Sequence, residues 1–283
     1  MWRNQSNLPL ALTDKPERTH VLNIIVCVKV VTDPEAPAST FKIDPEGKRA
    51  LPGQGVPPVL NPYDENSLEA ALKIKESQPV RITAISAGRS IPRSVIKKSL
   101  AVGADDLIVI EDEVFEETDS YTTAFILAAA VKKVGAFDLI LTGRMAADTN
   151  AGQVGQGMAE LLGISGITDA RKIEVKDGRV SVERVKADGY ELAEAPLPCL
   201  VSVSHELGEL RQATVKGLMA AQKHPFTTWK VADLGFSLPA GRRSQAQRLF
   251  IPDRKVNCEI IPGETPEEAG VNLALKLRQI RQL

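Results

Sequence analysis

The chain has 283 residues, with 35 Lys and Arg against 36 Asp and Glu, so its net charge is −1. This balance argues against a protein that coats nucleic acid, because such a protein needs an excess of cations to neutralise phosphates. Apolar residues make up 43% of the chain and aromatic residues only 4%, which predicts an aliphatic core. The three cysteines form no close pair, so we expect no disulfide framework, no zinc site and a reducing, cytoplasmic location.

The first 20 residues contain one short apolar run, Leu8 to Leu12, which Pro9 interrupts. This run is too short for a secretory signal, which needs ~7–15 apolar residues. No other stretch approaches the ~18 apolar residues of a membrane span. We therefore expect residues 1–20 to form an N-terminal extension of a protein without a membrane span.

Strand-like and helix-like segments alternate over the first half of the chain. Short β-branched runs predict strands that are buried on both faces, and apolar residues at helical spacing predict helices between them. This alternation predicts a doubly wound, mainly parallel α/β sheet. The expected strands cover 21–31, 80–85, 106–110 and 137–142. The first expected helix starts at Asp64, which is its candidate N-cap, and three more helices are expected over 92–102, 121–134 and 151–162.

The pattern changes after residue 165. Residues 171–185 alternate between polar and apolar around Asp177-Gly178, which predicts an added β-hairpin. Asp188-Gly189 predicts a second turn. Further along, we expect a strand over 197–203, a loop and a short helix over 207–224, an irregular surface segment over 235–255, and a last helix that Thr265 caps.

The most informative segment for function is 143–155, which follows an expected strand and precedes an expected helix. Ligands of doubly wound sheets bind beyond the carboxyl ends of the strands. Small residues let backbone N–H groups approach a ligand closely, and the following helix N-terminus favours phosphate. No Gly-Lys-Ser/Thr follows, so this is not a Walker A loop. The pattern suits a nucleotide-phosphate loop and an ordinary strand–helix turn equally well.

Other residues point away from bond-breaking chemistry. Asn61-Pro-Tyr-Asp-Glu65 opens an expected helix, and by itself it indicates a capped helix start more than a ligand contact. The three histidines are scattered along the chain, which argues against a triad or a metal site. Cys27 and Cys199 lie within apolar runs and are expected to be core residues. We therefore expect a protein that binds or carries a ligand and has no catalytic residues of its own.

Several motifs, taken in order, resemble the beta subunit of electron transfer flavoproteins. The resemblance extends over about residues 21–283. The motifs are Asn23-Ile-Ile-Val-Cys-Val-Lys29, Asn61-Pro-Tyr-Asp-Glu-Asn-Ser-Leu-Glu-Ala-Ala-Leu72, Gly143-Arg144 with Asp148 and Gly152-Gln-Val-Gly155, Leu197-Pro-Cys-Leu-Val-Ser-Val203 and Glu209-Leu-Arg-Gln-Ala-Thr-Val-Lys-Gly-Leu-Met-Ala-Ala221.

The resemblance implies a heterodimer in which an alpha subunit carries most of the FAD site. The beta subunit would hold AMP, or a second FAD, and the pair would pass electrons between an acyl-CoA-type dehydrogenase and an electron acceptor. Val215 would be the apolar anchor that docks partner dehydrogenases, and Tyr63 would lie near the alpha-subunit flavin. The implied cofactor contacts are Cys27, Asn61, Pro62, Tyr63, Asp64, Ala87, Asp148, Thr149, Asn150, Ala151, Gly152, Gln153 and Val154.

The resemblance also implies how the chain is divided. After the extension at 1–20, residues 21–235 would form the nucleotide-binding domain with its hairpin and docking loop, and residues 236–283 an arm and helix that contact the partner subunit. Two segments depart from the usual family pattern. Asp148-Thr149-Asn150-Ala151 replaces Asp-Gly-Asp-Thr, and Leu210-Arg211-Gln212 replaces Pro-Arg-Tyr in the docking segment.

Two other functions remain open at this point. An electron-bifurcating member would hold a second FAD in this subunit and oxidise NADH, and the Asp188-Gly189-Tyr190 turn and the Trp229-Lys230 pair resemble that branch. A stand-alone adenine-nucleotide-binding regulatory protein would use the same α/β core. The long tail from Gly241 to Leu283 argues against this last function, because it resembles an arm that reaches another subunit.

Overall fold

The computed structural model describes residues 21–280 except 49, 52, 54, 117, 240 and 253–257, so the expected extension at 1–20 lies outside the described residues. The strands are β1 (Leu22–Cys27), β2 (Val30–Thr32), β3 (Lys42–Ile43), β4 (Ala50–Leu51), β5 (Pro58–Leu60), β6 (Val80–Gly88), β7 (Asp106–Glu111), β8 (Leu139–Gly143), β9 (Ser165–Lys176), β10 (Arg179–Lys186), β11 (Gly189–Pro196), β12 (Cys199–Val203) and β13 (Thr227–Trp229). The helices are α1 (Pro62–Ser77), α2 (Arg93–Ile96), α3 (Lys98–Val102), α4 (Ser120–Val134), α5 (Val154–Leu162), α6 (Val215–Lys223) and α7 (Pro266–Gln279).

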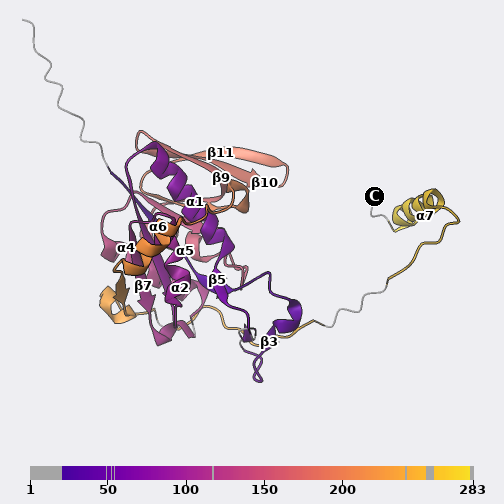
Figure 1. Cartoon of the computed structure of the whole chain (residues 1–283), viewed down its shortest axis with the longest axis horizontal. Helices are drawn as coiled ribbons and strands as arrows, with labels where there is room; N and C mark the ends of the chain where they lie inside the picture. Colours follow the sequence, from indigo (N-terminus) through magenta and orange to yellow (C-terminus); the bar gives the residue numbers. More distant parts are fainter. Residues whose placement is uncertain are drawn as a thin grey trace, which may run out of the picture.

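Nine of the described strands form one twisted sheet in the order β11-β10-β9-β12-β8-β1-β6-β7-β13 (Figure 1). Neighbours from β9 to β13 are parallel, and β10 and β11 add an antiparallel hairpin at one edge. The predicted α/β class and the added hairpin are therefore confirmed. From β1 the chain adds β6 and β7 on one side, and later β8 on the other side. The strand order thus reverses between β1 and β8, and this is where doubly wound sheets bind ligands.

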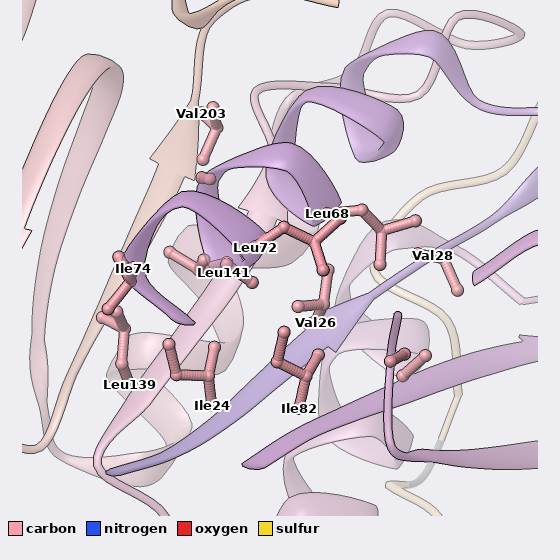
Figure 2. Packing of buried hydrophobic residues seen from close by; sticks show 14 of the residues in the cluster. Ile24, Val26, Val28, Leu68, Leu72, Ile74, Ile82, Leu139, Leu141 and Val203 are labelled. Atoms are coloured by element: carbon pink, nitrogen blue, oxygen red, sulfur yellow. The ribbon is translucent and has the colours of Figure 1, made fainter. Parts of the chain in front are cut away.

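The apolar run of β1 serves two cores because successive side chains point to opposite faces of the sheet. Ile24 and Val26 belong to one buried cluster, whereas Ile25 and Cys27 belong to the other. Figure 2 shows the first cluster, in which Leu68 of α1 lies over the sheet. A fully buried aliphatic side chain stabilises the fold by ~1.5–3 kcal/mol. Both faces of β1 are covered, which explains why its sequence does not alternate.

Each face of the sheet has its own helices. Leu68 of α1, Leu100 of α3 and Ala221 of α6 belong to the first cluster. Ile126 of α4 and Met158 of α5 belong to the second. The sheet therefore lies between two helical layers, as the doubly wound pattern predicts.

Three predicted boundaries were wrong. The expected strand over 21–31 ends at Cys27, because the chain then leaves the main sheet and β2 pairs with β5 instead. The expected helix over 92–102 is divided into α2 and α3 at Lys97, where ψ is −10°. The helix expected from residue 151 begins only at Val154, because Asn150 and Gly152 have positive φ angles that a helix cannot contain.

The C-terminal part agrees with the sequence pattern. Asp177 and Gly178 have φ angles of 51° and 71°, as a two-residue hairpin turn requires. The described residues from 235 to 252 contain no helix or strand. Thr265 caps α7 by accepting the Glu268 amide at 3.2 Å, and α7 lies away from the sheet (Figure 1). No helix among the described residues is long and apolar enough to cross a membrane.

Candidate functional site

A cavity of about 810 Å³ opens at the carboxyl ends of β1, β6 and β8. It therefore lies at the reversal point of the strand order. The start of α4 and the start of α5 form part of its wall, and so does a segment from the C-terminal part of the chain. Its lining includes Cys27–Lys29, Asn61, Asp64, Ala87–Arg89, Asp119, Ser120, Thr123, Thr142–Ala146, Thr149, Ala151–Gly155, Arg242 and Ser244–Ala246.

Asp64 joins the two strands that flank this reversal point. Its Oδ2 accepts the Lys29 amide at 2.7 Å, and its Oδ1 accepts the Gly143 amide at 3.1 Å. The prediction that Asp64 caps the helix was therefore wrong, since α1 already starts at Pro62, where the fixed φ of proline suits the first helical position. Burial raises the pKa of Asp64 to about 7, although the two amides act to lower it.

Asn61 holds the segment that follows β8. Its side-chain amide donates to the Met145 carbonyl at 2.9 Å, and its Oδ1 accepts the Ala147 amide at 3.0 Å. Only 1% of Asn61 is exposed, so the protein shields these bonds from bulk solvent. The Asn61-Pro-Tyr-Asp motif is thus more than a helix start, because it determines where the 143–153 segment lies.

Two glycines allow the close packing in this segment. A Cβ on Gly143 would lie 2.4 Å from Asp64 Oδ1 and 2.8 Å from the Tyr63 carbonyl carbon, so no side chain fits there. Gly152 has a φ of +62°, and a Cβ there would lie 3.3 Å from the Arg144 carbonyl oxygen. These two glycines let the segment pack closely against Asp64 and the Arg144 carbonyl, and both of them line the cavity.

A buried hydroxyl group at the cavity has no partner in the protein. Thr142 is 5% exposed, lines the cavity at the end of β8, and its Oγ1 makes no hydrogen bond. A Cβ on Gly155 would lie 2.6 Å from this oxygen, so glycine is what lets the first turn of α5 approach it. Buried hydroxyls are seldom left unpaired. Thr142 therefore fits a site whose ligand supplies the missing partner.

Among the described residues, the cavity is lined by five cationic and four acidic side chains, and several of the cations are held in place. Lys29 Nζ contacts both carboxylate oxygens of Asp148, at 2.7 and 2.9 Å. Arg89 pairs with Glu113 at 2.7 Å, and the Arg144 guanidinium lies 5.4 Å from the centre of the Tyr63 ring. Cys27 also lines the cavity, but burial raises the pKa of its thiol to about 12. Cys27 is therefore a wall residue and no nucleophile at neutral pH.

The structure gathers most of the implied cofactor contacts in this one cavity. Cys27, Asn61, Asp64, Ala87, Thr149, Ala151, Gly152, Gln153 and Val154 line it. Pro62, Tyr63, Asp148 and Asn150 do not, although Asp148 reaches it through Lys29. Sequence reasoning missed Asp119 and residues 242–246. Asp119 carries a helix-capping signal that could have been read, whereas nothing in the sequence pattern brings residues 242–246 to the strand ends.

Val215 lies outside this cavity, at the start of α6, where it forms an exposed apolar group with its helical neighbours. It is 75% exposed, and Leu218 and Met219 are 49% and 59% exposed. Thr214 caps the helix by accepting the Gly217 amide at 3.0 Å. A cluster of exposed apolar side chains on a well-fixed helix start is a feature of docking surfaces.

The segment before Val215 is clamped to α1. Arg211 donates from Nε and a terminal nitrogen to the Glu69 carboxylate at 3.0 and 2.8 Å, and also contacts Glu76 at 2.7 Å. Burial acts to raise the pKa of Glu69, but Arg211 outweighs this and lowers it. Asn66 donates to the Gly208 carbonyl at 2.6 Å. These α1 side chains fix the segment that precedes Val215.

The remaining sequence features lie elsewhere. His205 and His224 do not line the cavity, and His20 lies outside the described residues. Tyr190 and Trp229 belong to β11 and β13, which are the two opposite edges of the sheet. No cluster of potential metal ligands occurs among the described residues.

Comparison with known proteins gives the family. The model of the electron transfer flavoprotein domain matches residues 53–234. CarD, a caffeyl-CoA reductase-Etf complex subunit of Acetobacterium woodii, is 36% identical over 263 residues, which cover 91% of this chain and 98% of CarD. The electron transfer flavoprotein subunit beta of Megasphaera elsdenii is 34% identical over 264 residues, covering 88% and 95% of the two chains. Protein FixA of Azotobacter vinelandii is 30% identical over 265 residues, covering 89% and 92%.

These matches confirm the resemblance that the motifs predicted, and they cover most of both chains in each pair. The chain therefore belongs to the electron transfer flavoprotein family, as a beta-subunit member.

Proposed function

We propose that the chain pairs with an alpha subunit, that the pair holds FAD, and that the cavity of this chain holds an adenine nucleotide. The main support is the position of the cavity at the reversal of strand order, with a buried and unpartnered Thr142 hydroxyl in its wall. Residues 151–155, before and in the first turn of α5, line the cavity, where their backbone amides would bind phosphate. The bound flavin supplies the redox chemistry.

The residues of this chain would bind the nucleotide and hold it in position. Asp64 and Asn61 fix the 143–153 segment, and the first turn of α5 presents a partial positive charge beside it. Lys29 and Arg144 add positive charge at the rim, which suits an anionic ligand. Electrons would enter or leave through a dehydrogenase or an acceptor docked at Val215, where exposed apolar side chains favour transient association.

The C-terminal residues 236–283 are proposed to contact the alpha subunit. Val271, Leu275 and Ile280 are 59%, 53% and 54% exposed on and just after α7, an unusual number of uncovered apolar side chains for one short helix. Burial of these side chains against another subunit would stabilise the assembly. We propose a cytoplasmic location, which suits unpaired cysteines at 27, 199 and 258.

The cavity size is compatible with a second candidate, in which the ligand is a second FAD and the complex bifurcates electrons from NADH. A volume of about 810 Å³ is in the upper part of the ~300–1,000 Å³ range for ligand pockets, and FAD contains an AMP unit plus a flavin unit. Neither Tyr190 nor Trp229 lines the cavity, so these residues do not add support.

Flavin and nucleotide content of the purified two-subunit complex separates these functions. About one FAD and one AMP per complex would support simple transfer, and about two FAD with NADH oxidation would support bifurcation. A complex with no flavin would refute the proposal. A stable monomer of this chain that binds ATP tightly and associates with no second subunit would support the stand-alone regulatory function instead.

A further inference from the structure

We propose that residues 242–249 form a strap that closes the mouth of the nucleotide cavity, and that Asp119 is the latch that holds this strap in place. The inference rests on the proposed function, because the strap needs a nucleotide to enclose. It adds regulation of ligand release to that function.

The strap lies at the cavity although it is far in the sequence from the other residues that line the cavity. Arg242, Ser244, Gln245 and Ala246 line the cavity together with residues 27–29 and 151–155. They supply a cation, a hydroxyl and a side-chain amide, which can all bind an anionic nucleotide. The strap therefore belongs to the wall of the site.

The two ends of the strap are attached to different sides of the mouth. At one end, Arg243 and Ser244 bind the start of α4 through Asp119. At the other end, the Leu249 amide donates to the Gly47 carbonyl in the β3–β4 hairpin, and Glu46 and Lys48 of that hairpin also line the cavity. Figure 1 shows the chain passing beside β3 before it leads toward α7. The segment thus bridges the opening from α4 to the hairpin.

Asp119 binds the strap with one oxygen and α4 with the other. Its Oδ2 accepts the Arg243 amide at 2.6 Å and the Ser244 amide at 2.9 Å, while its Oδ1 accepts the Thr122 amide at 2.8 Å. The Arg243 guanidinium also lies 5.1 Å from the centre of the Tyr121 ring. Desolvation acts to raise the pKa of Asp119, but these amides outweigh it and lower the pKa to about 2. The latch is therefore a carboxylate at neutral pH, and its bonds are charge-assisted.

This arrangement makes release of the nucleotide depend on one carboxylate. A ligand under the strap leaves by a wider opening once the strap lifts, and lifting breaks both amide bonds to Asp119. The remainder of the cavity wall need not change. The latch should therefore affect how fast the nucleotide leaves more than how the cavity recognises it.

Asp119→Asn tests the latch in the full-length chain. Asparagine is as good an N-cap as aspartate, so α4 should keep its cap. The asparagine side chain lacks, however, the second carboxylate oxygen, which in the wild type accepts the two strap amides. We would load the protein with tritiated AMP, and separately with FAD, and follow release after adding excess unlabelled nucleotide. Release should be about tenfold faster than in the wild type, as expected for weakened charge-assisted bonds.

Three further variants complete the experiment. Ser244→Pro removes one strap amide and the Ser244 hydroxyl without changing α4, and Ser244→Ala removes the hydroxyl alone, so release should be faster from Ser244→Pro than from Ser244→Ala. Asp112→Asn is the matched control, because Asp112 accepts the Val114 and Val231 amides at 3.2 and 3.1 Å and does not line the cavity. Release from this variant should equal that of the wild type. In the wild type, hydrogen exchange of peptide 241–248 should also slow when AMP or FAD is added.

The outcomes distinguish the strap from the proposed function. If the wild type retains nucleotide but Asp119→Asn and Ser244→Pro release it at the wild-type rate, the strap is refuted and the nucleotide site stands. The strap is also refuted if Asp112→Asn accelerates release as much as Asp119→Asn. If the wild type retains neither AMP nor FAD, the nucleotide site itself is refuted and the strap with it.

Discussion

Replacing Asp64 by asparagine should remove a pH dependence of stability that the buried Asp64 carboxyl group gives to the wild type. Aspartate in the unfolded chain titrates near 3.8, and burial raises the pKa of Asp64 to about 7 in the fold. The folded state therefore holds its proton more tightly, and the wild type loses stability as pH rises from about 4 through 7. This cost approaches ~4 kcal/mol above pH 7, since each pKa unit corresponds to ~1.36 kcal/mol.

The test is the difference in unfolding free energy between Asp64→Asn and the wild type, measured by urea denaturation at several pH values. Linkage makes this cost about 2 kcal/mol at pH 5 and about 4 kcal/mol at pH 8, so the variant should gain roughly 2–3 kcal/mol relative to the wild type over this range. Asparagine offers one carbonyl oxygen, so either the Lys29 or the Gly143 amide loses its acceptor, at a cost of ~1–3 kcal/mol that does not vary with pH. A difference that stays flat from pH 5 to 8 would refute the reasoning, and Asp188→Asn, on an exposed side chain, is the control.

Three further changes test the cavity and the docking segment. Gly152→Val should strain a backbone with φ of +62° and obstruct the phosphate wall, so nucleotide content after desalting should fall, whereas Gly163→Ala, with φ of +67° and open space around it, should retain its nucleotide. Val215→Ala should slow electron transfer to the partner while flavin content stays constant, and unchanged rates would exclude it as the anchor. Glu69→Gln weakens the Arg211 clamp and should cost about 2 kcal/mol in urea unfolding.

The sequence predicts the sheet well because burial on two faces leaves a direct trace in composition. Continuous aliphatic runs such as Ile24–Val26 mark strands between two helical layers. The Asp177-Gly178 turn is equally clear, because few residues adopt two consecutive left-handed conformations. The boundaries at Cys27 and Val154 were missed, since they depend on positive φ angles and on which sheet a strand joins.

The site was predicted only in part, for a different physical reason. Small residues that follow a predicted strand can be recognised in a sequence, so residues 151–154 could be assigned to the ligand-binding end of the sheet. The role of Asp64 could not be predicted, because an aspartate near a helix start usually caps it, and only the approach of Lys29 and Gly143 gives it other donors. Residues 242–246 are bound by their backbone amides, which every residue except proline has. Such contacts leave no mark on residue type.

Helix α1 connects the cavity and the docking segment in one rigid frame. Its first turn carries Asp64, which joins β1 and β8, and one turn later Glu69 clamps Arg211 ahead of Val215. Between them, Leu68 is 1% exposed and packs into the core, so the helix cannot shift without disturbing a close-packed layer. The distance from the cavity to Val215 is therefore set by the core. Under the proposed function, a partner bound at Val215 would meet the ligand in the cavity in one fixed geometry.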